Sequence, residues 1–438
     1  QTQPAAYTDG IDRDGSLANG VTTTNDVISS INVSSGNAGT SYNFGERGTT
    51  VSGTVYVDDD RDGVLESGEA VRVGGVTIEL FDMASGSPVL VATAVTGTDG
   101  TYSFNHLPTG NYRLVQTQPL QYGNTSANTI DFTLPLTGST GRNFGEALYD
   151  IGNKIYFDAN NNGFQDASEE GLANVNVTLQ YAGRDGVFGN ADDPAAITVT
   201  TDTDGNYLFT ELFLGNYTIT VDQSDLPAGM SVTDETDDAA LGAPVMNSVS
   251  NISITNADRF DVDFGYTGAL SIGDTFWYDA DGDGTRNLKD SDGDGTPDTV
   301  EPGLGGVTVN LTFAGADGNF TTLDDNLTLT TTTASDGTYS FDNLPEGDYR
   351  ISYVVGGIPA GLTATRETDD SSVAIDGTSN ISLTADRSDV DFGFEGSFSI
   401  GDRVWFDADG DGVQDSGEPG LANIGVTLIF AGADGDFS

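Results

Sequence analysis

The feature that most constrains this chain is an internal repeat. Four segments carry nearly the same five-residue word: YNFGE at 42–46, RNFGE at 142–146, VDFGY at 262–266 and VDFGF at 390–394. The shared glycine recurs at positions 45, 145, 265 and 393, so the intervals are 100, 120 and 128 residues. A repeat of this length is a normal size for one domain. The chain is therefore predicted to be a tandem array of similar domains.

The repeat predicts three whole domains and two partial ones. The whole domains are expected at residues 49–147, 148–267 and 268–395. Residues 1–48 correspond to the C-terminal part of such a domain, and residues 396–438 to the N-terminal part of a further one. Joined together, the two partial segments would still lack the central hairpin of a unit. We therefore expect a window from a longer repeated chain rather than one domain completed by the head and tail of neighbouring molecules.

Within each unit the apolar residues alternate with polar ones, which is the period of a β-strand. Examples are VTIELF at 76–81, VNVTLQY at 175–181 and VTVNLTF at 307–313. The segment at 99–114, DGTYSFNHLPTGNYRL, reads as two alternating strands with turn residues before and between them. No segment keeps a helical period. The predicted fold class is all-β, as tandem Ig-like or Greek-key β-sandwich domains with calcium-binding loops.

The charge balance is strongly acidic, with 68 Asp and Glu against 15 Lys and Arg and a formal net charge of -53. Such a chain repels nucleic acid and anionic membranes. The 22 Phe and 16 Tyr are more than a disordered acidic tail would carry. Cysteine is absent, so neither disulfides nor thiolate metal sites are available. No apolar run is long enough to span a membrane. We expect the acidic groups to be clustered around bound cations.

The acidic residues do cluster, in loops with the spacing of a twelve-residue calcium site. Such a loop places oxygen ligands at positions 1, 3, 5, 7, 9 and 12 and glycine at position 6. Two matches overlap at Asp290. The predicted calcium ligands, with position 7 contributing its carbonyl, are Asp58, Asp60, Asp62, Val64, Glu66 and Glu69; Asp158, Asn160, Asn162, Phe164, Asp166 and Glu169; Asp279, Asp281, Asp283, Thr285, Asn287 and Asp290; Asp290, Asp292, Asp294, Thr296, Asp298 and Glu301; and Asp407, Asp409, Asp411, Val413, Asp415 and Glu418.

The chemistry accounts for the spacing. A hard cation takes six to eight oxygens, and alternate residues of a curled loop all point inward. The alternative is a solvated acidic turn without an ion. Because the loops follow strands, a fixed structural ion is favoured over a helix-opening switch. Weaker candidates, for which an Asp-rich surface turn is an equal alternative, are Asp185 with Asp192 and Asp193, Asp317 with Asp324 and Asp325, and the pairs Asp237–Asp238 and Asp369–Asp370.

With these motifs in hand, the chain resembles the B-type repeat of serine-aspartate repeat surface adhesins, which is related to the collagen-adhesin B domain. The resemblance covers essentially the whole chain. It is most specific at IGDRVWFDADGDGVQDSGEPGLANIGVTL, residues 400–428. It implies calcium-dependent Greek-key sandwiches, arranged as a rod that projects a binding region from a cell surface.

The functional expectation is a non-catalytic, extracellular or cell-surface stalk or fibre stabilised by calcium. The expected partners are calcium ions, neighbouring repeats of the same or identical chains, and a host or matrix ligand. Export follows from the weak affinity expected of such sites, which cytosolic calcium would leave empty. His106 is the one histidine and falls in a turn, and no nucleophile and base pair can be assembled across the repeats. Two alternatives stay open: an adhesin that binds a specific ligand, and a subunit of a self-assembling filament.

Overall fold

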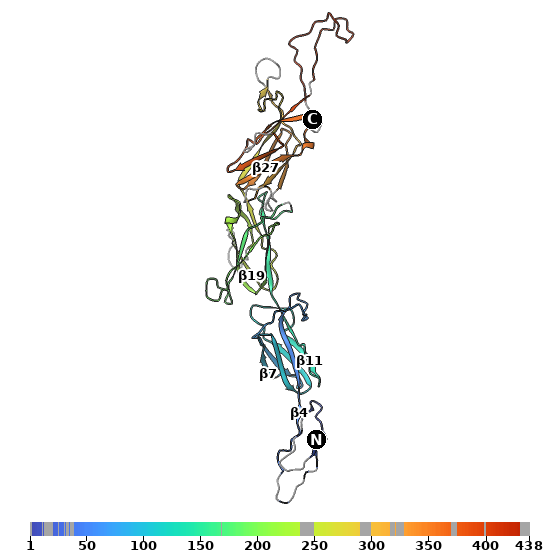
Figure 1. Ribbon diagram of the computed structural model, residues 1–438, viewed down its shortest axis with the longest axis vertical. Coiled ribbons are helices and arrows are strands. Elements are labelled where there is room, and N and C mark those ends of the chain that lie inside the picture. Colours follow the sequence, from blue (N-terminus) through green and yellow to red (C-terminus); the bar gives the residue numbers. More distant parts are fainter. Residues whose placement is uncertain are drawn as a thin grey trace.

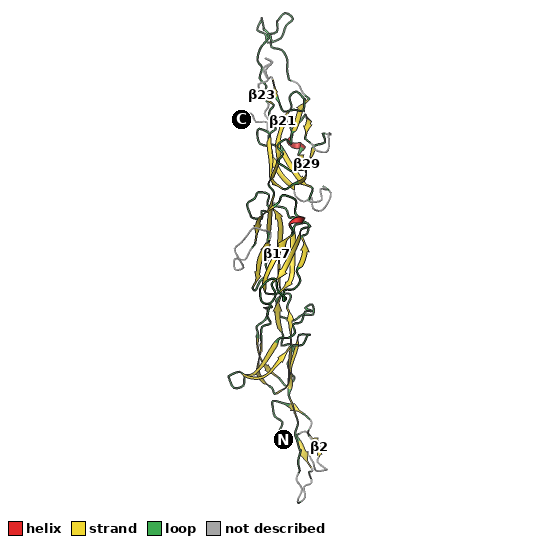
Figure 2. Ribbon diagram, turned by 90° about the vertical axis from the view of Figure 1, so that its left-hand side faces the viewer, coloured by secondary structure: helices red, strands yellow, loops and turns green. Residues whose placement is uncertain are grey.

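Three β-sandwiches follow one another along an elongated molecule (Figure 1). The computed structural model describes residues 2–10, 12, 21–24, 26–29, 31, 35, 39–167, 169–236, 249–289, 299–315, 320, 328–368, 375–397 and 400–429. The strands run along the long axis of the molecule, so the loops gather at the two ends of each sandwich (Figure 2). The predicted all-β, tandem sandwich fold is confirmed.

The first unit consists of two four-stranded sheets, ordered β10-β12-β5-β8 and β11-β9-β6-β7. Its strands are β5 (Thr49–Val57), β6 (Thr77–Asp82), β7 (Val89–Val95), β8 (Thr101–Leu107), β9 (Gly110–Gln116), β10 (Gly123–Asn124), β11 (Thr129–Leu134) and β12 (Phe144–Ala147).

The second and third units have the same architecture. Their sheets are ordered β16-β13-β20-β18 and β15-β14-β17-β19, then β26-β21-β30-β28 and β25-β24-β27-β29. The strands of the second unit are β13 (Tyr149–Phe157), β14 (Asn176–Tyr181), β15 (Ile197–Thr200), β16 (Asn206–Leu212), β17 (Gly215–Val221), β18 (Ser231–Glu235), β19 (Val249–Ile254) and β20 (Phe264–Thr267). Those of the third are β21 (Leu270–Tyr278), β24 (Thr308–Phe313), β25 (Thr328–Thr332), β26 (Thr338–Leu344), β27 (Gly347–Tyr353), β28 (Leu362–Glu367), β29 (Thr378–Leu383) and β30 (Phe392–Gly396).

Short elements complete the description. Three two-stranded pairs are β1 (Thr8–Asp9) with β4 (Glu46–Arg47), β2 (Val21–Thr24) with β3 (Val27–Ser29), and β22 (Leu288–Lys289) with β23 (Thr299–Val300). The described helices are two 3₁₀ turns, η1 (Gln223–Asp225) and η2 (Val355–Gly357). Within the described residues, no helix has the length and apolar character needed to cross a membrane.

Each sandwich is closed by a parallel pair formed between its first and last strands. In the first unit Phe144 of β12 pairs with Val55 of β5, and β13 with β20 and β21 with β30 repeat this arrangement. The pairing continues one residue further, because the backbone N–H of Asp58 donates to the carbonyl of Glu146 at 2.9 Å. The repeated NFG or DFG word therefore lies beside the strand from which the acidic loop of the same unit starts.

The alternating strands bury one side chain in two, as the sequence predicted. In β14 the burial of Asn176–Tyr181 switches at every residue, with Val177, Leu179 and Tyr181 inside. Each unit has a cluster of buried aliphatic and aromatic side chains, and that of the third unit also includes Phe157 from the end of β13. Trp277, which the sequence places beside the acidic loop of the third unit, is 1% exposed and belongs to the interior. Burial of these side chains is the main stabilising contribution in each unit.

In each of the three whole units, the first strand of the hairpin has a residue with a left-handed backbone conformation near its end. His106, Glu211 and Asn343 occupy equivalent places and have φ values of 61°, 60° and 60°. Asn adopts this conformation readily, whereas for most other residues with a Cβ it has a higher conformational free energy. His106 was expected in a turn, but it lies near the end of β8, where the pairing with β5 shifts register, and its place is taken by Glu and Asn in the sister units.

Replacing Glu211 with Asn should stabilise the second unit by about 1 kcal/mol, because the left-handed conformation costs Asn less. Hydrogen exchange of the second unit's amides would measure the change. Glu211→Gln is the matched control, since it removes the same charge but keeps the conformational cost. Equal effects of the two substitutions would show that charge, and not the backbone conformation, limits this turn.

The joints between units are short. Only Leu148 separates β12 from β13, and only Gly268 and Ala269 separate β20 from β21. At Gly268 a Cβ atom would collide with the backbone of Leu344 and Pro345, so the chain requires glycine where it enters the third unit. Linkers of one or two residues hold successive sandwiches close together.

Candidate metal centres

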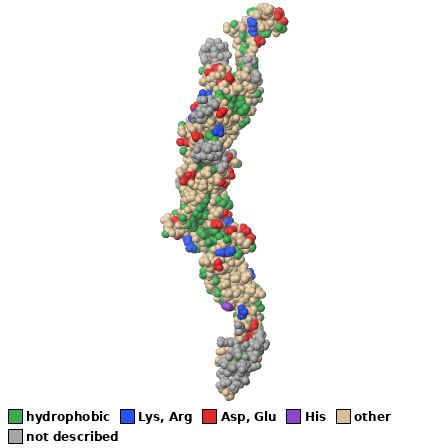
Figure 3. All heavy atoms as spheres, in the orientation of Figure 1, with side chains coloured by type: hydrophobic (Ala, Val, Ile, Leu, Met, Phe, Trp, Pro, Cys, Tyr) green, Lys and Arg blue, Asp and Glu red, His purple; other side chains and the backbone are tan. Residues whose placement is uncertain are grey.

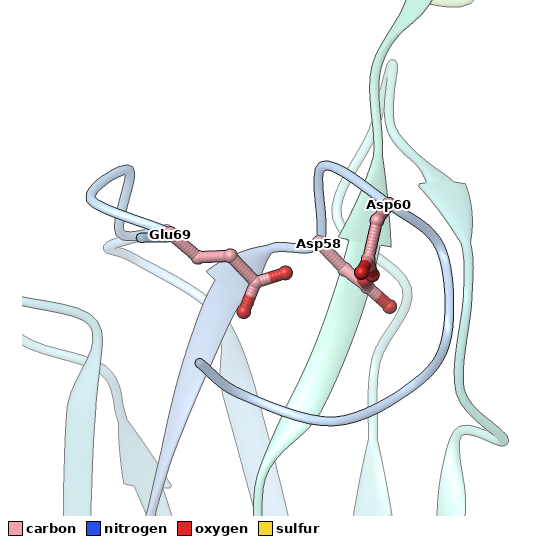
Figure 4. Close-up of side chains that lie close together, drawn as sticks. All are labelled: Asp58, Asp60 and Glu69. Carbon is pink, nitrogen blue, oxygen red and sulfur yellow. The ribbon is translucent and has the colours of Figure 1, made fainter. Parts of the chain in front are cut away.

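The acidic loop of the first unit gathers three carboxylates. One oxygen from each of Asp58, Asp60 and Glu69 lies within 4.8 Å of the others. Figure 4 shows Asp58 and Asp60 pointing toward each other, with Glu69 approaching from the opposite side of the loop. A second group, Asp60 with Asp62 and Glu66, meets the same distance limit. Five of the six predicted positions therefore present carboxylates to one region, and the sixth, Val64, was predicted to contribute a carbonyl.

Backbone hydrogen bonds hold this loop in its curled shape. Asp58 Oδ2 accepts from the N–H of Gly63 at 2.9 Å, and Gly63 has the left-handed φ of 81° that its predicted turn position requires. Glu69 closes the loop by accepting from the N–H of Asp59 at 3.1 Å and from that of Glu66 at 2.8 Å. Alternate residues of the segment between them consequently point to one side.

Two carboxylates of the loop are buried, and one of their oxygens has no hydrogen-bond partner among the described residues. Asp58 and Glu69 are only 1% and 5% exposed. Asp58 Oδ1 is buried and has no hydrogen-bond partner. Partial desolvation, followed by the charges of Asp62 and Glu69, raises the pKa of Glu66 above its ordinary value. An unpartnered carboxylate oxygen in a concentration of like charge fits a hard divalent cation, which takes oxygen ligands and offsets the repulsion.

The third unit has a carboxylate cluster of the same kind, which includes Glu301, the predicted closing ligand of its second loop. Asp279, Asp281 and Glu301 each bring an oxygen within 4.8 Å of the others. Glu301 accepts from the N–H of Ala280 at 2.6 Å, as Glu69 does from Asp59. Its second oxygen, Oε2, is buried and has no hydrogen-bond partner among the described residues. Glu301 therefore lies with the first carboxylates of the Asp279 loop, whereas Asp290, the predicted closing ligand of that loop, is outside the described residues.

The remaining predicted ligands of this unit divide into two groups. Asp283 accepts from the N–H of Thr285 at 2.8 Å and from the amide of Asn287 at 2.9 Å. These contacts hold the turn of the Asp279 loop. The predicted second loop, comprising Asp290, Asp292, Asp294, Thr296 and Asp298, lies outside the described residues.

The loop of the C-terminal partial unit repeats the pattern. Asp407, Asp409 and Glu418 form one group, and Asp409, Asp411 and Asp415 form another. The backbone N–H of Gly412 lowers the pKa of Asp407 below its usual range, and burial opposes this only in part. Val413 lies at the position predicted to offer a carbonyl, and its N–H donates to Asp411 Oδ1 at 2.8 Å.

The loop of the second unit differs, because two of its predicted ligands are asparagines. The Asn160 and Asn162 amides both donate to Asp166 Oδ2, at 2.7 and 2.9 Å. Asp158 Oδ2 accepts from the N–H of Gly163, and Glu169 from that of Ala159, so the backbone keeps the same curl. Phe164, the predicted carbonyl ligand, has its side chain 72% exposed. Within the described residues, no three carboxylates of this loop meet at a common point.

The weaker candidates have ordinary turn contacts where they are described. Asp192 Oδ2 accepts from the N–H of Arg184 at 2.8 Å, Asp193 Oδ2 from that of Gly189 at 2.6 Å, and Asp185 from Val187 at 2.8 Å. The other candidates, Asp317 with Asp324 and Asp325, Asp237–Asp238 and Asp369–Asp370, lie outside the described residues. Figure 3 shows Asp and Glu side chains in separate groups along the length of the molecule, with few Lys and Arg between them.

One buried acid was not found from the sequence. Glu146, at the end of the repeated word in the first unit, is fully buried and accepts hydrogen bonds from the amides of Gln116 and Gln118. Burial raises the pKa of Glu146 to about 7, and the two amides oppose this rise. The equivalent residues are Glu46, Tyr266 and Phe394, and the two aromatic residues among them were the available signal that this position is buried.

The raised pKa of Glu146 predicts a pH dependence. In the unfolded chain this carboxyl loses its proton near its ordinary pKa, whereas in the folded unit it keeps it to about pH 7. The free energy of unfolding of the first unit should therefore fall as pH rises between these values and level off above them. Hydrogen exchange in chelator, compared between the native chain and Glu146→Gln, would isolate this effect. Identical pH dependence in the two proteins would contradict it.

Comparisons with known proteins agree with the architecture. The sequence profile of the SdrD B-like domain matches residues 49–132, 149–266, 286–394 and 398–436. Serine-aspartate repeat-containing protein D of Staphylococcus aureus (strain Newman) is 30% identical over 423 residues, covering 90% of this chain and 29% of that protein. Serine-aspartate repeat-containing protein F of Staphylococcus epidermidis (strain ATCC 12228 / FDA PCI 1200) is 29% identical, covering 85% and 22%. The chain thus spans less than a third of these relatives.

Solved structures that the comparison matches include the Bacillus anthracis TIE protein, with a TM-score of 0.28, 13% identity and coverage of 80% of this chain and 52% of that one. The Streptococcal ancillary pilin has a TM-score of 0.28 and 12% identity, with coverage of 80% and 98%.

Fold and repeated loops together define a tandem array of immunoglobulin-like β-sandwich domains. The chain belongs to the SdrD B-like domain family, as the resemblance in its sequence indicated. The chain is extracellular and exposed at the cell surface, and its role is that of a stalk or fibre.

Proposed function

We propose that this chain is a calcium-stabilised, non-catalytic section of an extracellular stalk. The observation that carries the proposal is the recurrence of a carboxylate cluster at the end of the first strand of a unit, with buried and unpartnered oxygens of Asp58 and Glu301. Carboxylates in this arrangement would bind Ca²⁺, whose charge would offset their mutual repulsion. The site's contribution is to fix the loop, and no substrate is involved.

Calcium binding would also offset part of the chain's net charge. A chain of net charge -53 is destabilised in its compact state by self-repulsion. Ions held at the loops would lower the local charge where successive sandwiches meet. A ligand that binds only the folded state also raises the free energy of unfolding, by about 2.7 kcal/mol per site when its concentration is 100 times the dissociation constant.

The partners that we propose are calcium ions and neighbouring repeats. The joints support contacts between repeats, because the Leu214 N–H donates to the Gln121 carbonyl at 2.7 Å and the rings of Tyr122 and Phe213 lie 5.2 Å apart. The absence of catalysis is part of the proposal and rests on the domain family and on the backbone role of His106 at the register shift of β8.

Removing calcium should lower the melting temperature. Glu69→Gln should abolish the part of the stabilisation that comes from calcium bound in the first loop. The expected loss for that unit is about 2–3 kcal/mol at saturating calcium. Calorimetry with calcium and with chelator would measure it. Glu79→Gln on β6 is the matched control, because it removes the same charge outside the loop. An unchanged melting temperature in chelator would overturn the proposal.

The second loop should bind calcium more weakly than the first, because Asn160 and Asn162 supply neutral amides in place of carboxylates. The double substitution Asn160→Asp with Asn162→Asp should therefore add a tighter site. Isothermal titration calorimetry would count and rank the sites. If the double variant gained no affinity, the loop geometry rather than its charge would be limiting.

A further inference from the structure

An arginine inside the first acidic loop reaches across the joint to the second unit. Arg61 Nη1 and Nη2 donate to Asp258 Oδ2 and Oδ1 at 2.9 and 2.7 Å, which is a two-point ion pair. Nη2 also donates to the carbonyl of Leu148, the single linker residue, at 2.7 Å. The guanidinium lies 4.9 Å from the centre of the Tyr149 ring. One side chain of the first unit therefore contacts the linker, the first strand and a distant loop of the second.

The geometry of this contact makes it stronger than an ordinary surface ion pair. Arg61 and Asp258 are 36% and 22% exposed, so the pair is partly shielded from water. Asp258 Oδ1 also accepts from the N–H of Asp150 at 3.0 Å, which fixes the acceptor. Two-point pairing with a fixed carboxylate and stacking on an aromatic ring are the conditions under which arginine pairs contribute measurably.

Arg61 occupies position 4 of the loop, between candidate ligands Asp60 and Asp62. It is the only cationic residue of that loop. Without a cation, the loop carboxylates attract its guanidinium and compete with Asp258. A divalent ion in the loop would neutralise those carboxylates and repel the guanidinium, and both effects favour its contact with Asp258.

We propose that Arg61 couples cation binding in the first loop to the docking of the second unit. This inference rests on the proposed function, because it assigns a consequence to the ion in that loop. The coupling is reciprocal: an ion that favours the docked joint must itself bind more tightly when the joint is docked. Arg61 acts as a positioning residue and not as a ligand.

The next joint provides an internal comparison. Asn161 takes the place of Arg61 and has the same left-handed backbone, with φ of 54° against 60°. The acceptor is retained, because Asp386 accepts from the N–H of Ser271 at 3.0 Å as Asp258 does from Asp150. Among the described residues, the hydrogen bonds across this joint are neutral ones, such as that from the Asn343 amide to the carbonyl of Ala159 at 2.9 Å. The second joint thus has the acceptor but lacks the arginine.

Distances between spin labels in the full chain would test the coupling, since the native sequence has no cysteine to interfere. Labels at Thr93→Cys and Thr210→Cys, both exposed, report the first joint. With calcium the distance distribution should be narrow, and in chelator it should widen. Arg61→Gln and Asp258→Asn should each leave the distribution in calcium wider than that of the native chain and shift the calcium midpoint of the remaining narrowing by about fivefold or more.

Labels at Thr210→Cys and Thr332→Cys report the second joint and should be unaffected by Arg61→Gln. Asn161→Arg should narrow that distribution in calcium by supplying the missing donor to Asp386. If Arg61→Gln and Asp258→Asn leave the first distribution and its calcium midpoint unchanged, the coupling is wrong. In that case a melting temperature that still falls in chelator would leave the proposed function standing. If the melting temperature is instead the same with and without chelator, the proposed function is wrong.

Discussion

The structure depends on the parallel pairing between the first and last strands of each sandwich. This pairing closes the two-sheet core, and it continues one hydrogen bond beyond the strands, to the aspartate that opens each acidic loop in the three whole units. The loop therefore begins at a rigid edge and not on a free segment. Because the strands lie along the molecular axis, this edge faces the next unit (Figure 2). One backbone interaction thus determines both where the carboxylates gather and that they gather near the joints.

The second constraint is charge. Carboxylates that are only a few per cent exposed and have unpartnered oxygens are costly unless a cation accompanies them. The loops are not equivalent in this respect. The first and third loops concentrate carboxylates, whereas the second satisfies Asp166 with the amides of Asn160 and Asn162. A repeated fold can therefore carry sites of graded strength, because single substitutions at ligand positions alter the charge without altering the backbone curl.

The joints combine the two constraints. A one-residue linker brings the first loop so close to the second unit that a loop residue, Arg61, can pair with Asp258. The second joint has a two-residue linker and neutral contacts. Identical folds are therefore joined by different chemistry, and in a stalk the resistance to bending is decided at the joints rather than within the sandwiches.

The sequence by itself determined the repeat, the all-β fold, the family and the placement of acidic loops after strands, because these depend on local signals: the two-residue period of strands and the regular spacing of loop ligands. Tertiary structure decided what depends on distant residues. Glu301 joins the carboxylates at the start of the Asp279 loop, since a strand pairing brings it back to the loop entrance. Arg61 and Asp258 are 197 positions apart, and Glu146 is buried by packing against Gln116 and Gln118. No local pattern contains these contacts, because each exists only after the chain has folded back on itself.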